Sequence, residues 1–303
     1  MRVLLEPFQF GFLRHALVVC MFAGALCGLL GVFVTLRGMS YIGHGLSHAI
    51  FGGAAICAAL SLNFYIGAGI WGLGSGLAIG KVSRRRIIGS DAAIGVITTA
   101  SFAFGIALLG FYSRVKQSIE ATVFGSVLGV SQGDMIIVIV VTLLTIGIVI
   151  AFYRKLLFTT FDPEVAEVSG VNVARIDALL MLLLSFAILS SMKVLGVTLI
   201  AAALVVPAVI ARMLTNSFAR MLWLSSLIGG VSGLVGMYLS YHLDVSPGAM
   251  IVLVGFFVFV VVFAVTGRSG LRRAAGLDDH HRVESASAAS PSVTGLRSNV
   301  EAV

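Results

Sequence analysis

The chain has 303 residues, of which 59% are hydrophobic and only 11% are charged, and its mean hydropathy is +1.08. Water-soluble globular proteins carry about 25% charged residues, so the composition indicates an integral membrane protein. Long apolar runs with 35 glycines favour packed helices over a β-barrel, whose strands alternate in polarity. The net charge of +7 comes from Lys and Arg at the ends of apolar runs. We interpret them as membrane anchors and expect no nucleic-acid partner.

Apolar stretches between charged residues predict an all-α, polytopic bundle of eight to nine transmembrane helices. The first stretch is too long for the core of a cleavable signal, so we expect it to remain in the mature chain. A shorter run at 118–133 cannot cross the membrane and is expected to be re-entrant or a half-helix. The nine predicted spans are residues 15–36, 40–62, 64–80, 92–113, 134–153, 176–192, 194–211, 221–241 and 248–267.

The distribution of Lys and Arg predicts the orientation. With nine spans, 13 of these residues fall on one side and 5 on the other, which places the C-terminus in the cytoplasm and the N-terminus outside. With eight spans the N-terminus moves inside. Residues 1–267 form the predicted transmembrane domain, and the Ser- and Ala-rich residues 268–303 form a predicted disordered cytoplasmic tail. His280 and His281 in this tail are interpreted as solvated, with weak metal binding as the alternative.

Glycines recur at four-residue spacing on three of the predicted helices. Such spacing puts a flat face on one side of a helix and lets the backbones of neighbouring helices approach closely. The pattern therefore predicts helix contacts at Gly24 and Gly28, at Gly72, Gly76 and Gly80, and at Gly229 and Gly233.

His44 and His48 are the ionisable residues that lie well inside a predicted span, where such groups are costly and often functional. Their i, i+4 spacing puts both imidazoles on one helix face, as two ligands of one transition-metal ion require. A rise of 1.5 Å per residue from Arg37 places them roughly 10 to 16 Å deep. The alternative is a pair of neutral histidines that hydrogen-bond at a helix interface. The spacing alone does not decide between the two.

Motifs for enzymatic chemistry find little support in the sequence, since it contains no HExxH and no embedded Ser/His/Asp set. The stretch from Gly76 to Val82 is a near miss to a phosphate-binding loop, because Val82 stands where Ser or Thr must reach Mg²⁺. We therefore expect the chain not to be an enzyme, and any ATP to be hydrolysed by another chain.

The loop between the fifth and sixth predicted spans contains the signals of a short helix. Asp162 can cap the helix, Pro163 suits its first position, Glu164 is favourable in the first turn, and Gly170 suits its end. The sequence therefore predicts a two-turn helix on the cytoplasmic surface, which by itself is no more than a connector.

Four motifs in order give the chain a family resemblance: Gly31–Arg37 with Gly43–His48, Phe161–Glu164 with Gly170, Val197–Arg212, and Pro247–Leu253. Together they resemble the zinc/manganese permease subunits of ATP-binding-cassette (ABC) importers, over about residues 5 to 267. The resemblance implies a type II ABC importer permease-like bundle in the bacterial plasma (inner) membrane. It also implies a permease homodimer, two cytoplasmic ATP-binding subunits and an extracytoplasmic metal-binding protein.

The resemblance further assigns roles to residues. The ATPase subunits would be contacted by the short helix, through Asp162, Pro163, Glu164, Glu167 and Gly170. His44 and His48 would line the path of Zn²⁺ or Mn²⁺, which is the transported substrate and not a permanently bound cofactor.

One position departs from the family pattern, which usually reads Gly-Asp-x-Leu-Ser-His. His48 matches this pattern, whereas His44 stands where the Asp would be. Imidazole nitrogen favours Zn²⁺, and carboxylate oxygen suits Mn²⁺. We therefore expect zinc to be preferred over manganese.

Two other functions stay open at this point. A permease for a vitamin or a metal chelate would need a wide pathway and no histidine pair on it. An ion-coupled secondary transporter would need carboxylates at the midplane of the membrane, and no predicted span places one there.

Overall fold

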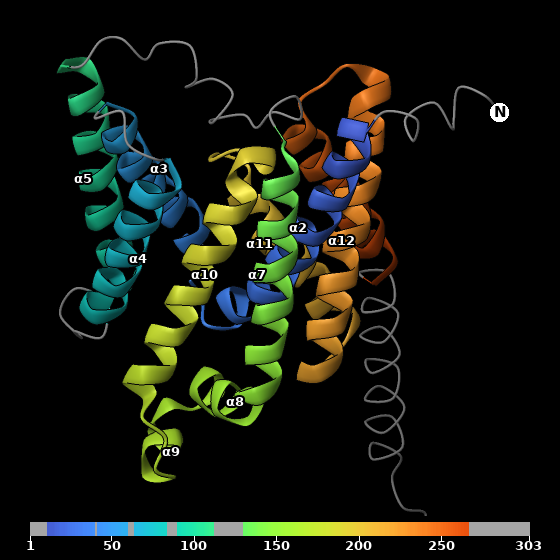
Figure 1. Cartoon of the computed structure of the whole chain (residues 1–303). Helices are drawn as coiled ribbons and strands as arrows, with labels where there is room; N and C mark the ends of the chain where they lie inside the picture. Colours follow the sequence, from blue (N-terminus) through green and yellow to red (C-terminus); the bar gives the residue numbers. More distant parts are fainter. Residues whose placement is uncertain (1–10, 40, 60–63, 84–89, 112–129, 267–303) are drawn as a thin grey trace, which may run out of the picture. The chain divides into compact units, whose positions relative to one another are not determined.

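The computed structural model describes residues 11–39, 41–59, 64–83, 90–111 and 130–266 (Figure 1). Within these ranges the regular secondary structure is all helical, as predicted. The predicted re-entrant run lies outside the described residues from 118 to 129, and so does the predicted tail with His280 and His281. The chain divides into two compact units, Met1–Phe259 and Val260–Val303. The predicted site residues all belong to the first.

The described helices follow the predicted spans closely. They are α2 (Gly11–Leu36), α3 (Ile42–Ala59), α4 (Phe64–Ser83), α5 (Ser90–Phe111), α7 (Gln132–Ala151), α8 (Tyr153–Phe161), α9 (Pro163–Val168), α10 (Val173–Leu195), α11 (Ile200–Leu214) and α12 (Phe218–Leu243), followed by the helix Pro247–Thr266.

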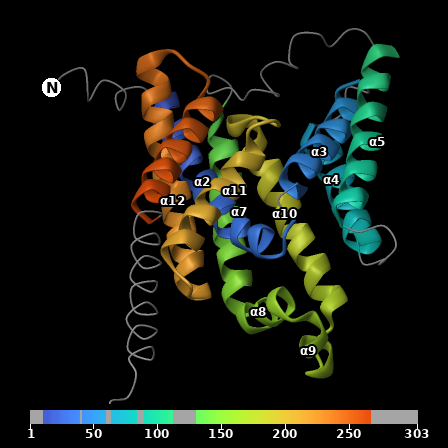
Figure 2. The same ribbon diagram turned by 180° about the vertical axis from the view of Figure 1, so that it is seen from behind.

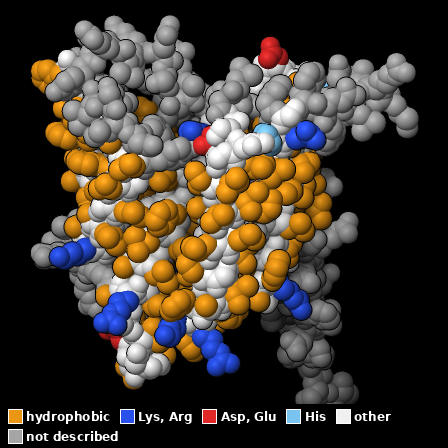
Figure 3. Space-filling view, in the orientation of Figure 1, with side chains coloured by type: hydrophobic (Ala, Val, Ile, Leu, Met, Phe, Trp, Pro, Cys, Tyr) orange, Lys and Arg blue, Asp and Glu red, His pale blue; other side chains and the backbone are white. Residues whose placement is uncertain are grey.

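Six of the described helices are long and apolar enough to cross a membrane, judged by length and composition. Three shorter apolar helices, Ile42–Cys57, Ile66–Val82 and Ile200–Leu214, fall below that length. The number of spans, eight to nine, therefore stays a prediction. Hydrophobic side chains cover most of the described surface that Figure 3 shows, and Lys and Arg gather near its lower end, where α8 and α9 lie. This distribution suits a chain surrounded by lipid between two aqueous layers.

The helices α2 and α12 lie side by side and touch backbone to backbone (Figures 1 and 2). A Cβ atom on Gly24 would meet the carbonyl oxygen of Gly229, and a Cβ on Gly229 would meet that of Gly24. Gly233 faces the carbonyl of Cys20 in the same way. The hydroxyl of Ser225 adds a hydrogen bond across the contact, to the carbonyl oxygen of Gly28. Small residues thus allow the close approach of two long helices.

The glycines of α4 face two different neighbours. A Cβ on Gly72 would meet the side chain of Ile50 in α3. Cβ atoms on Gly76 and Gly80 would instead meet the side chains of Ser185 and Met181 in α10. The hydroxyl of Ser185 on α10 also lies 3.3 Å from the carbonyl oxygen of Gly72. As a result α4 packs between α3 and α10, and α3 also packs along α5.

The boundary between the sixth and seventh spans lies further along the chain than the predicted break at Lys193. Helix α10 continues to Leu195 and ends at Gly196, whose φ of 78° suits glycine. Lys193 lies in the last turn, where a positive charge is favourable. Its ammonium group also forms a 2.9 Å ion pair with Asp134 of α7. A charged residue that ends an apolar run therefore does not end the helix here.

Candidate metal site

The connection from α2 to α3 is short and hydrogen-bonded, and it places the two histidines at the start of α3. Gly38 has a φ of 67°, and its N–H donates to the carbonyl oxygen of Thr35 at 3.3 Å. The N–H of Met39 donates to Val34 at 3.0 Å. This pair of bonds is the Schellman ending of a helix. The chain therefore turns within a few residues, and α3 begins at Ile42.

His44 and His48 lie together on one face of the first two turns of α3. Their Nε2 atoms are 3.2 Å apart, and their ring centroids are 4.4 Å apart. Two imidazole nitrogens that each lie about 2.05 Å from one zinc ion would subtend an angle of about 100° at this separation, close to the tetrahedral angle. The pair is thus already spaced to hold one ion.

The same separation also fits a hydrogen bond, in which one ring donates and the other accepts. Binding a metal requires both Nε2 atoms to be unprotonated, so each Nδ1 must carry the proton. The Nδ1 atom of His48 is buried, and the described residues offer it no hydrogen-bond partner. Histidine ligands usually donate this N–H to an acceptor, which strengthens the metal bond. The missing acceptor therefore favours weak, transient binding.

The two imidazoles differ in their surroundings. The ring of His48 is half-buried and meets Phe102 of α5 edge to face, with centroids 4.8 Å apart. The ring of His44 is exposed and lies 6.2 Å from the ring of Tyr41, which is itself 69% exposed. His48 is therefore fixed by packing, and His44 faces outward from the single chain.

Ser47 fastens the site helix to a distant part of the chain, and the sequence motifs did not reveal this role. Its buried hydroxyl lies 2.8 Å from the carbonyl oxygen of His44 and 2.8 Å from that of Val197. Gly43 packs on Ala201 of α11 beside it. Since Val197 is 150 residues away, only the folded structure brings it to the histidine pair.

The histidine pair is incomplete as a closed metal site. In the part of the chain that the structure describes, no group of three or more His, Cys, Asp and Glu residues could hold a metal ion. A structural zinc site has four protein ligands. Two ligands from this chain leave the remaining positions for water, backbone or a second subunit.

The predicted surface helix contains the second set of site residues. It is α9, where the Asp162 carboxylate accepts a 3.0 Å hydrogen bond from the N–H of Val165 and Pro163 occupies the first turn. Gly170 follows the helix with a φ of 79°. Glu164 and Glu167 are exposed and line a hollow of about 720 Å³. The structure therefore gathers these five residues in one short surface segment, separate from the histidine pair.

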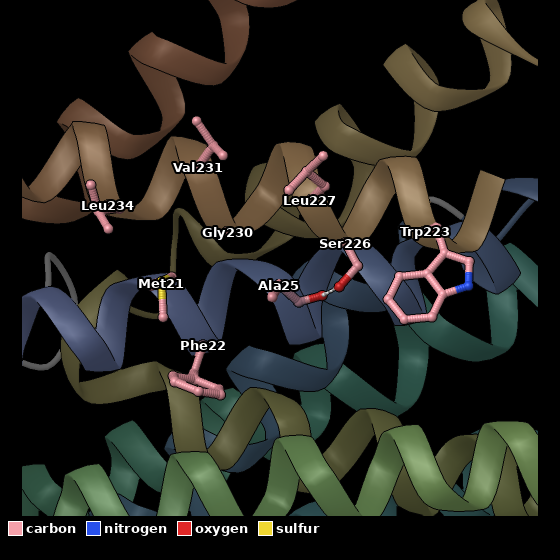
Figure 4. Close-up of a pocket in the computed structure, with 9 residues that line it drawn as sticks. All are labelled: Met21, Phe22, Ala25, Trp223, Ser226, Leu227, Gly230, Val231 and Leu234. Carbon is pink, nitrogen blue, oxygen red and sulfur yellow. Dashed lines mark hydrogen bonds between the residues drawn. The ribbon is translucent and has the colours of Figure 1, made fainter. Parts of the chain in front are cut away.

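An apolar groove on α2 and α12 offers no charged ligand to a cation. Figure 4 shows this pocket of about 330 Å³, with Met21, Phe22 and Ala25 on one side and Trp223 to Leu234 on the other. Its one polar side chain, Ser226, donates a 3.0 Å hydrogen bond to the carbonyl oxygen of Ala25. A surface of this kind suits lipid or another apolar helix.

Comparison with known proteins decides the family. Residues 9–266 match the ABC 3 transport family. The chain belongs to this family. This confirms the permease family predicted from the four sequence motifs.

Curated relatives align with most of this chain. The chain is 38% identical to the manganese transport system membrane protein MntC of Listeria innocua over 263 residues, 87% of this chain and 94% of the relative. It is 35% identical to the manganese import system permease protein ScaB of Streptococcus parasanguinis, over 85% of this chain and 91% of the relative. A probable iron transport system membrane protein of Haemophilus influenzae is 33% identical, over 86% of this chain and 96% of the relative.

Solved structures support the same fold. A chain of PsaBC from Streptococcus pneumoniae, solved in complex with Fab, superposes with a TM-score of 0.77 at 34% identity, over 86% of this chain and 94% of that chain. A putative metal-chelate type ABC transporter in an inward-facing conformation superposes with a TM-score of 0.63, over 83% and 84%. At 17% identity, this second likeness concerns the fold alone.

Proposed function

We propose that this chain is the permease subunit of an ABC importer that carries a divalent transition-metal ion into the cytoplasm. The observation that carries the proposal is the 3.2 Å separation of the two Nε2 atoms on a short apolar helix. Ionisable side chains in such helices are costly and mark ion pathways. Relatives with manganese and iron in their names are consistent with a divalent cargo.

The pathway would run between two copies of the permease. His44 faces outward from the single chain and belongs to an incomplete ligand set. A two-fold axis brings the same surface of two subunits together, so a second copy would add two more imidazoles. Four nitrogens match the coordination number of zinc. The first turn of α3 also carries a partial positive charge, which weakens the hold on a cation and helps its release.

Within this proposal zinc is the preferred cargo. Affinity at a nitrogen site rises from Mn²⁺ towards Zn²⁺, and neither histidine supplies the hard oxygen that Mn²⁺ favours. The names of several relatives point to manganese instead. The ligand chemistry of His44 and the names of relatives thus give opposite expectations, which a measurement on this chain can separate.

ATP would be hydrolysed by two copies of a separate cytoplasmic subunit that contact α9, and metal would arrive from an extracytoplasmic binding protein. The exposed acidic residues and the capped end of α9 support this docking role. With nine spans the C-terminus would lie in the cytoplasm.

The proposal is tested by reconstituting the chain in liposomes with its ATPase and binding protein and following ⁶⁵Zn and ⁵⁴Mn. We expect ATP-dependent uptake that His48→Ala reduces at least tenfold, because His48 is the ligand fixed by packing. Lys155→Ala, an exposed change outside the site, serves as control. Uptake that ignores ATP, or that His48→Ala leaves unchanged, would contradict the proposal. A vitamin or a chelate that competes with the free ion would favour the alternative cargo.

A further inference from the structure

Arg37 holds together three elements at the end of the molecule where α9 lies. Its Nη1 forms a 2.6 Å ion pair with Asp177 on α10. Its Nη2 donates to the hydroxyl of Thr159 at 3.0 Å, and its Nε donates to that of Thr160 at 3.3 Å, both on α8. The side chains of Arg37 and Asp177 are only 11% and 19% exposed. This burial screens the pair from solvent and makes it sensitive to small displacements.

The two threonines are oriented to accept from Arg37. The hydroxyl of Thr160 donates to the carbonyl oxygen of Leu156 at 2.6 Å, and that of Thr159 lies 3.2 Å from the same oxygen. A hydroxyl that donates its hydrogen to the helix presents its lone pairs elsewhere. The planar guanidinium matches these acceptors and the carboxylate with fixed directions, which the single ammonium group of Lys cannot reproduce.

The elements that Arg37 joins are those on either side of α9. Helix α8 ends at Phe161 and α10 begins at Val173, so α9 lies between them in the chain and packs on both. Pro163, Glu164 and Glu167 of the α9 segment line the same hollow as Arg37 and Asp177. A displacement of α9 therefore reaches the rest of the permease through the two helices that Arg37 contacts.

On its other side Arg37 lies at the hydrogen-bonded end of α2, a few residues before the histidine helix. It is the C-cap residue of α2, directly before Gly38 and Met39 of the Schellman ending, and its N–H donates to the carbonyl oxygen of Phe33 at 3.0 Å. The N–H of Ile42, the first residue of α3, donates to Met39 at 2.9 Å. His44 follows two residues later. These hydrogen bonds link the end of α2 to the start of α3.

We infer that Arg37 is a positioning residue that transmits displacement of α9 to the helix carrying His44 and His48. The inference rests on the proposed function and adds the element through which hydrolysis and the metal path are coupled. In this account Arg37 touches neither metal nor ATP. Its contacts to Asp177, Thr159 and Thr160 fix the start of α3 relative to the helices flanking α9.

The experiment compares Arg37→Gln, Asp177→Asn and the double variant with the parent, each assembled with its ATPase and binding protein in liposomes. Arg220→Gln, an exposed arginine near the start of α12, is the matched control. Metal uptake and ATP hydrolysis are measured in the same vesicles. We expect Arg37→Gln to lower the ratio of metal moved to ATP hydrolysed about tenfold, with hydrolysis within twofold of the parent. The double variant should resemble Arg37→Gln, because both changes break one connection.

A second readout does not depend on transport. In a variant whose three cysteines are replaced by alanine, a cysteine placed by His44→Cys reports the accessibility of the site to maleimide. ATP should change the labelling rate when Arg37 is present, and the change should disappear in Arg37→Gln. An unchanged ratio of metal to ATP together with ATP-dependent labelling would overturn the role of Arg37. A loss of uptake in proportion to a loss of assembled complex would also overturn the role of Arg37. A parent that moves no metal but keeps ATP-dependent labelling would instead contradict the proposed function.

Discussion

At the scale of single residues, the identity of residue 44 is the sharpest test of metal preference. His44→Asp replaces an imidazole with a carboxylate at the same place, beside His48. The hard oxygen should favour Mn²⁺, so we expect the zinc-to-manganese uptake ratio to fall by a factor of about ten, which corresponds to roughly 1.4 kcal/mol. Competition between ⁶⁵Zn and ⁵⁴Mn in the same liposomes measures this ratio.

The folded state should tolerate this substitution well. His44 lies in the first turn of α3, where a negative charge is favourable, so the thermal midpoint of the permease should stay equal or rise. His44→Ala is the matched control, because it removes the imidazole without adding a carboxylate. If His44→Asp and the parent show the same ratio, selectivity does not reside at this position.

At the scale of elements, α9 is expected to bind the ATPase through its acidic surface. Replacing both Glu164 and Glu167 with Lys should weaken association by about tenfold or more, because complementary charges steer and align the partners. Both side chains are exposed, so the fold should persist. Co-purification of the ATPase with the permease, at low and at high salt, measures the effect.

Asp91→Lys is a suitable control for α9, since it reverses another exposed acidic residue, in the first turn of α5 on the predicted cytoplasmic side. High salt should reduce binding of the parent towards that of the double variant, because mobile ions screen exposed charges. Normal association of the double variant would show that the ATPase docks on a surface other than α9.

The contact between α2 and α12 depends on the absence of side chains. Gly229→Ala would push a Cβ against the carbonyl oxygen of Gly24, which belongs to a backbone that cannot rotate away. We expect a loss of about 1 to 3 kcal/mol in stability, read as a lower unfolding temperature in detergent. Gly147→Ala on α7 is the control. Nothing lies near its added Cβ, so alanine should be neutral or stabilising there.

At the scale of the whole molecule, the orientation in the membrane is open to a direct test. With nine spans, Glu167 lies on the cytoplasmic side and His242 on the outer side, and both are exposed. Each is replaced by cysteine in a chain without other cysteines, and intact cells are treated with an impermeant maleimide. We expect labelling at position 242 in intact cells, and at position 167 only after permeabilisation. The reverse pattern would invert the predicted orientation.

The sequence predicts those parts of the fold that depend on neighbouring residues. The caps of α9 are local signals, because Asp162, Pro163 and Gly170 lie within one short segment. The apolar runs similarly predict where most helices lie. The spacing of His44 and His48 is also local, and it places both rings on one face of α3.

Contacts between distant residues leave no such pattern in one sequence. Arg37 and Asp177 are 140 residues apart, and Ser47 and Val197 are 150 residues apart. Nothing near either residue indicates its partner, since each reads as an ordinary helix-end charge or small polar residue. The end of α10 differs from the prediction for a related reason: Lys193 forms an ion pair with Asp134 of another helix.

The pairing of α2 with α12 also constrains how the protein is made. Ser225 and Gly28 are joined across the contact although 197 residues separate them. At about 5 to 20 residues per second, a ribosome needs roughly 10 to 40 s to cover that distance. During this interval α2 lies in the bilayer without α12. Its mean hydropathy of 2.6 is sufficient to keep it inserted. A nascent chain that stops before α12 therefore leaves this glycine face, and the carbonyl oxygen of Gly28, without their partner.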